Sequence, residues 1–90
     1  MRNDDTIRRK RILFRCRHRG SKESDLLLGR FAESHIPDFD AAQLGRLESL
    51  IENDDPSLYA WITGRRPVPP RYDSDVMALL KDFSKTNVGS

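Results

Sequence analysis

Three side chains in this sequence belong to the types that bind metals or act as nucleophiles: Cys16, His18 and His35. Zinc sites usually have three or four ligands at characteristic spacings, whereas Cys16-x-His18 offers a single pair. The basic neighbours of Cys16 could lower the pKa of its thiol, but adjacent helical residues point in different directions and place no base beside it. The sequence therefore predicts no metal site, no catalytic residue and no enzyme activity.

The glycines do not form a phosphate-binding loop. Gly20, Gly29 and Gly45 are isolated, and no strand is expected before any of them. A chain of 90 residues builds one modest core and leaves no room for an enclosed cofactor cavity. We therefore expect one domain, residues 1–90, that binds no cofactor by itself.

Charge is distributed unevenly along the chain. Residues 1–20 carry eight basic and two acidic side chains, and residues 21–90 carry eight basic and twelve acidic ones. A basic arm is typical of nucleic-acid-binding regulators, including those of toxin–antitoxin systems. The basic residues here occupy all sides of the predicted helix, which disfavours nucleic acid. A basic helix lying on an acidic bundle, or on an acidic partner, explains the same charges, so an adaptor for an acidic protein is a further alternative.

Apolar residues recur with a helical period in five segments. The first helix is expected from about Thr6 to His18, with Asp4, Asp5 or Thr6 as its cap and a thin apolar face of Ile7, Leu13 and Phe14. The others are expected from Ser21 to His35, from Asp40 to about Glu52 behind an Asp40–Gln43 capping box, from an Asp55 cap to Thr63, and after a cap at Asp73 or Ser74. Short loops between amphipathic helices predict an all-α fold, a compact five-helix bundle with an ordered core over about residues 6–84.

Two short patterns stand out between these helices. Arg19-Gly20-Ser21-Lys22-Glu23 sets bare backbone beside both signs of charge at a corner that a partner could approach closely. The segment 54–61, Asp-Asp-Pro-Ser-Leu-Tyr-Ala-Trp, is a capped helix whose Leu58 and Trp61 are expected in the core, whereas Tyr59 points elsewhere.

Together these patterns resemble the SdhE family, the flavinylation factors of succinate dehydrogenase, over roughly residues 7–84. The resemblance implies a five-helix bundle that binds the flavoprotein subunit of succinate dehydrogenase and promotes covalent attachment of the FAD held by that partner. It implies that Arg19, Gly20 and Glu23 face the partner, with Asp25 at a matching acidic position and with Arg15 and Tyr59 as further candidates. Asp54, Asp55, Pro56, Tyr59 and Trp61 match a second, mainly structural signature. Ser24 departs from the family, whose members often carry a larger apolar residue there.

The compartment and the assembly state are predicted less directly. The amino terminus lacks the apolar region of a secretory signal, and Asp4 and Asp5 are unusual for a mitochondrial presequence. A lone cysteine suits a reducing compartment. We therefore expect the bacterial cytoplasm rather than the mitochondrial matrix, and no membrane association. The sequence leaves open the oligomeric state and whether the fumarate reductase flavoprotein is also a partner.

Overall fold

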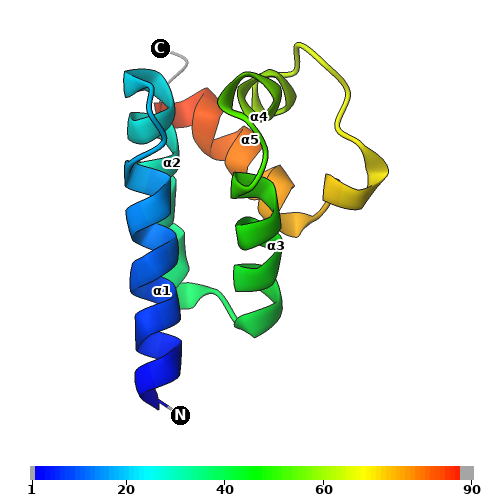
Figure 1. Cartoon of the computed structure of the whole chain (residues 1–90). Helices are drawn as coiled ribbons and strands as arrows, with labels where there is room; N and C mark the ends of the chain where they lie inside the picture. Colours follow the sequence, from blue (N-terminus) through cyan, green and yellow to red (C-terminus); the bar gives the residue numbers. More distant parts are fainter. Residues whose placement is uncertain (1, 88–90) are drawn as a thin grey trace.

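The computed structural model describes residues 2–87, and these form helices joined by short connections, apart from a longer one over residues 63–74. Figure 1 shows α1 and α2 side by side and antiparallel, with α3, α4 and α5 packed beside them. The predicted all-α five-helix bundle is confirmed. The helices are α1 (Arg2–Arg17), α2 (Lys22–His35), α3 (Ala41–Ile51), α4 (Asp55–Ile62) and α5 (Asp75–Asn87), with short 3-10 helices η1 (Ile36–Asp38) and η2 (Pro70–Tyr72).

Side-chain caps fix the starts of α2 and α3 as predicted. Ser21 Oγ accepts a hydrogen bond from the N–H of Ser24 at 3.2 Å. Asp40 and Gln43 form the full capping box, each side chain accepting from the other's backbone N–H. These caps accept hydrogen bonds from backbone N–H groups of the first helical turn, which have no carbonyl partner within the helix.

Two predicted helix starts are wrong. The helix α1 begins at Arg2 rather than near Thr6, so Asp4 and Asp5 lie inside its first turn, where carboxylates suit the helix dipole. The cap of α4 is Asp54 rather than Asp55: its backbone is extended and its carboxylate accepts the N–H of Ser57 at 3.0 Å. The shift by one residue releases the carboxylate of Asp55 for another contact.

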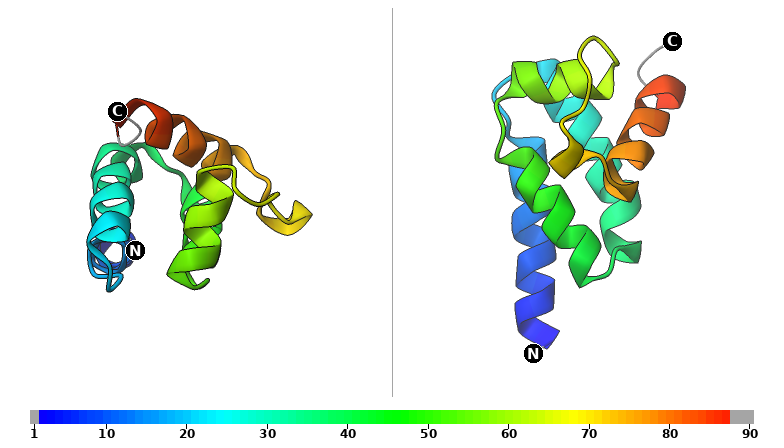
Figure 2. Two further views of the ribbon diagram at one scale, coloured as in Figure 1. Left: turned by 90° about the horizontal axis from the view of Figure 1, so that it is seen from above. Right: turned by 90° about the vertical axis from the view of Figure 1, so that its right-hand side faces the viewer.

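The most extensive helix contact joins α1 and α2. A Cβ added at Gly29 would lie 3.2 Å from Cγ of Arg17, so the absence of a side chain at Gly29 lets the two helices approach. Figure 2 shows this pair on one side of the molecule, with α3 and α4 on the other and α5 beside them. Within residues 2–87, no helix is long and apolar enough to cross a membrane.

The core lies between these helices, and two of the three α1 residues predicted for the apolar face do not reach it. Ile12 and Cys16, four residues apart on one helical face, are buried, and Leu13 is partly buried. Ile7 and Phe14 instead point away from the bundle, with 50% and 63% of their surfaces exposed. The prediction erred because it assigned the bulkiest apolar residues to the core and treated the cysteine as incidental.

Burial makes Cys16 an unreactive thiol. Its side chain is fully buried, and burial raises the pKa of the thiol to about 12, outweighing the opposing effect of Arg19 and Arg15. The suggestion that its basic neighbours activate it is therefore wrong. We expect iodoacetamide at pH 8 to leave the folded protein unmodified and to label it rapidly in denaturant, as mass spectrometry would show. Rapid labelling of the folded protein would contradict the burial of this side chain.

Candidate functional site: a groove at the corner between two helices

An open groove of about 460 Å3 lies where the corner between α1 and α2 faces the start of α4. The corner supplies one wall and the first turns of α4 supply the other. Its lining residues are Arg19, Gly20, Ser21, Glu23, Ser24, Asp55, Pro56 and Tyr59. The two patterns that stand out in the sequence, about thirty-five residues apart, thus meet at one place.

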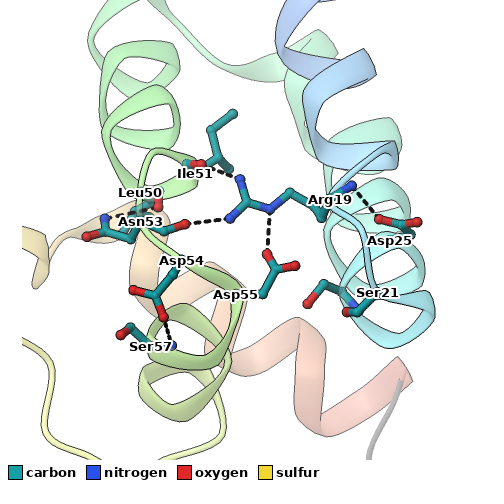
Figure 3. Close-up of polar contacts among 10 residues, drawn as sticks. Arg19, Ser21, Asp25, Leu50, Ile51, Asn53, Asp54, Asp55 and Ser57 are labelled. Carbon is teal, nitrogen blue, oxygen red and sulfur yellow. Dashed lines mark hydrogen bonds and ion pairs between the residues drawn. The ribbon is translucent and has the colours of Figure 1, made fainter.

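Arg19 holds the two walls together. Its Nε donates to Asp55 Oδ1 at 2.8 Å, and the other guanidinium nitrogens donate to the carbonyls of Ile51 and of Asn53, the latter at 2.6 Å. Figure 3 shows the side chain crossing from the corner to the junction of α3 and α4. Because only 10% of this side chain is exposed, the pair with Asp55 is shielded from solvent far more than a surface ion pair is. Arg19 therefore positions the groove, and its guanidinium is turned into the chain.

Gly20 gives the corner its shape. Its φ of +109° lies in a region that residues with a Cβ rarely adopt. A Cβ built there would meet no atom within 4 Å, so the glycine answers a backbone requirement and leaves open space above the corner. The backbone N–H of Arg19 donates to Asp25 Oδ1 at 2.5 Å, which fixes the corner from the α2 side.

The predicted partner-facing residues separate into two groups. Glu23 and Gly20 are exposed, and the half-buried Tyr59 joins them along the groove. The other group is engaged within the chain or lies elsewhere: Asp25 binds the corner backbone, and Arg15 is half-buried on α1 outside the groove lining.

Sequence reasoning missed part of the lining. Ser21 appeared only within the corner pattern, Asp55 and Pro56 only in the mainly structural signature, and Ser24 as a departure from the family; all four line the groove. Ser24 is 5% exposed, and its small size keeps this part of the groove open. The sequence did place these residues at the starts of α2 and α4. Because those two helix starts face one another, this position could have marked the residues as groove lining.

The groove offers recognition groups rather than catalytic ones. Within residues 2–87, no group of three or more histidine, cysteine or acidic side chains could hold a metal ion. Asp55 is held by Arg19, and Asp54 is held by its cap, where the N–H of Ser57 lowers the pKa of its carboxyl. The exposed carboxylate of Glu23, the ring of Tyr59 and the bare backbone of Gly20 remain for contacts with another molecule.

Comparisons with known proteins show which family the chain resembles. Residues 10–84 match the model of a family described as the flavinator of succinate dehydrogenase. Succinate dehydrogenase assembly factor 2-A, mitochondrial, of Drosophila mojavensis is 42% identical over 80 residues, which cover 87% of this chain and 51% of the relative. The 2-B factor of Drosophila simulans is 39% identical over 83 residues, 90% of this chain and 53% of the relative. The chain thus spans about half the length of these relatives.

The same comparisons correct the predicted compartment. The relatives from Drosophila mojavensis, Drosophila simulans and Drosophila grimshawi are all named mitochondrial, which points to the mitochondrion rather than to the bacterial cytoplasm. The prediction was wrong because it relied on the composition of the first residues. Acidic residues within α1 reflect its helix dipole and its ion pairs, and they do not report the compartment.

Proposed function

The chain belongs to the family described as the flavinator of succinate dehydrogenase, and from this premise we propose that it binds the flavoprotein subunit of that enzyme and promotes covalent attachment of FAD to it. We propose further that the groove at the corner of α1 and α2 receives a segment of the flavoprotein. The chain acts as an assembly factor, and the family is not named as an enzyme.

One observation carries the proposal: the groove is built around a glycine whose backbone is exposed and whose open side has no neighbour within 4 Å. A partner's backbone can approach such a position more closely than any position that bears a side chain. Arg19 prevents the walls from separating, so the groove is formed before the partner arrives and less ordering is needed on binding.

The proposed contribution to flavin attachment is geometric. FAD, carried by the flavoprotein, supplies the methyl carbon on C8 of its flavin ring, and this carbon becomes bonded to a histidine of that subunit. Because the groove places recognition groups at an open corner, this chain's part is to hold one conformation of its partner. Holding reacting groups in a near-attack arrangement can lower a barrier by several kcal/mol.

Gly20→Arg tests the groove. The new side chain fills the open side of the corner, so we expect it to abolish binding and covalent flavin attachment. Covalent flavin is read by in-gel fluorescence of purified flavoprotein incubated with FAD and either wild type or variant. Gly64→Arg is the matched control, because Gly64 also has a positive φ, of +81°, and also has no atom within 4 Å of a built Cβ, but lies after α4 outside the groove lining.

Both variants place an arginine in a left-handed backbone conformation, and each should lower the free energy of unfolding by about 1 kcal/mol. Similar thermal unfolding for the two, with flavin attachment lost only in Gly20→Arg, supports the groove. Full attachment with Gly20→Arg would show that the groove is the wrong surface. A wild-type protein that neither binds the flavoprotein nor raises its covalent flavin would overturn the function itself.

A further inference from the structure

We propose that the outward face of α1, formed by Ile7, Lys10, Arg11 and Phe14 together with His18 just after the helix, is a second contact surface for the same flavoprotein. It would dock on an acidic surface that has an apolar depression for Phe14. The inference rests on the proposed function, because it takes the flavoprotein as the partner. It goes further in assigning a role to the basic helix and a chemistry to the surface that meets it.

The structure divides the basic residues of α1 into two sets. Arg8 donates to Glu48 on α3 at 2.6 Å, Arg9 donates to the carbonyl of Phe39 at 2.8 Å, and Arg17 pairs with Glu33 on α2. These arginines tie the helix to the acidic body. Lys10 and Arg11 are exposed, and neither forms an ion pair within the described residues.

The unpaired charges share their face with apolar side chains. Ile7 and Phe14 are seven residues apart, close to two helical turns, and therefore point the same way. They are 50% and 63% exposed, and the ring of Phe14 rests on that of His18 with centroids 4.3 Å apart. Ile12 and Cys16 occupy the opposite, buried face. Exposed aromatic and cationic side chains together are typical of interface cores and their rims.

This composition favours a protein surface over the other anionic partners. Nucleic-acid backbones would use the two cations but would leave Ile7 exposed to water or to phosphate. A membrane-surface helix carries a wider apolar face than two residues supply. An acidic protein surface with one apolar depression would contact both the cations and the apolar side chains of this face.

The outward face is also continuous with the groove. His18 ends it two residues before Gly20, so a partner seated at the corner lies beside α1. The first turns of α1 project past η1, as the views in Figures 1 and 2 agree, and this projecting part is accessible to a large partner.

Two variants of this face test the inference: the charge reversal Lys10→Glu/Arg11→Glu, and Phe14→Ser. The matched control for the first is Arg30→Glu/Lys85→Glu, which makes the same change of charge at exposed sites on α2 and α5 that form no ion pair within the described residues. Binding to purified flavoprotein is measured by calorimetry at two salt concentrations, beside in-gel flavin fluorescence and thermal unfolding.

We expect each α1 variant to weaken binding about tenfold or more, and the charge reversal to remove most of the salt dependence. The control pair should bind within about twofold of wild type, since long-range charge effects are screened by salt. Wild type that binds, with α1 variants no weaker than the control pair, overturns this inference and leaves the proposed function standing. Loss of RNA or anionic-vesicle binding in the α1 variants, with flavoprotein binding intact, also overturns it.

Discussion

Arg19→Ala is expected to destabilise the protein by about 3 kcal/mol, the order of loss seen when one partner of a buried, hydrogen-bonded ion pair is removed. The change leaves Asp55 without its cation and the carbonyls of Ile51 and Asn53 without their donor. For a domain of this size, such a loss lowers the midpoint of thermal unfolding by roughly 15 °C. Circular dichroism at 222 nm during heating measures it directly.

Arg17→Ala is the control for this change. The arginine at position 17 also pairs with a carboxylate, that of Glu33, but both side chains are about half exposed, so its removal should cost at most about 1 kcal/mol. Arg19→Lys separates charge from geometry, because an ammonium cannot reproduce the planar fork that meets three acceptors. If Arg19→Ala and Arg17→Ala unfold at the same temperature, Arg19 does not join the groove walls.

The same reasoning predicts how function is lost. Without Arg19, the corner and the α3–α4 junction are held only by their other contacts, so the groove loses its fixed width. Arg19→Ala should therefore weaken flavoprotein binding even though its guanidinium does not face the partner. The resemblance to the SdhE family implied that Arg19 faces the partner, whereas the structure shows its guanidinium engaged by Asp55 and by the carbonyls of Ile51 and Asn53.

Much of the fold was predictable because its determinants are local. Ser21 caps α2, the Asp40–Gln43 box starts α3, and Gly64 follows α4 with a positive φ, each recognisable from a few neighbouring residues. The apolar face of α1 was not predictable in the same way. Its small cysteine is buried and its phenylalanine is exposed because packing against Gly29 and α2, which is not local, decides the rotation of the helix.

In the candidate site, too, local features were predictable from the sequence and contacts between distant segments were not. The sequence marked the corner and the start of α4 as separate patterns, and the structure brings Gly20, Glu23 and Tyr59 together along one groove. That these residues face a partner stays a prediction. The inward turn of Arg19 depends on carbonyls at the end of α3, more than thirty residues away, and no spacing rule reports them. The position of the α4 cap mattered as well, since only with Asp54 as cap is Asp55 free to meet Arg19.

Phe31→Ala is expected to cost about 4 kcal/mol, the usual order for removing a fully buried phenylalanine and leaving a cavity. Phe31 is 0% exposed and lies among rings on three elements: His35 at 4.4 Å, Phe83 at 5.7 Å and Phe39 at 6.1 Å between centroids. Those rings belong to α2, α5 and the segment after η1, so they cannot all move in to fill the space. Urea unfolding followed by circular dichroism gives the free energy of unfolding.

Phe14→Ala is the matched control, because it removes the same side chain from a position that is 63% exposed. Its effect on the free energy of unfolding should stay within about 0.5 kcal/mol, with the higher helix propensity of alanine offsetting the lost contact with His18. The two variants together then distinguish a phenylalanine that stabilises the fold from one that contacts the partner. Phe31→Ala should reduce flavoprotein binding only as far as it unfolds the chain, whereas Phe14→Ala should reduce binding in a fully folded protein. A large loss of stability in Phe14→Ala would mean that this ring serves the fold, and the outward face of α1 would then lose its apolar anchor.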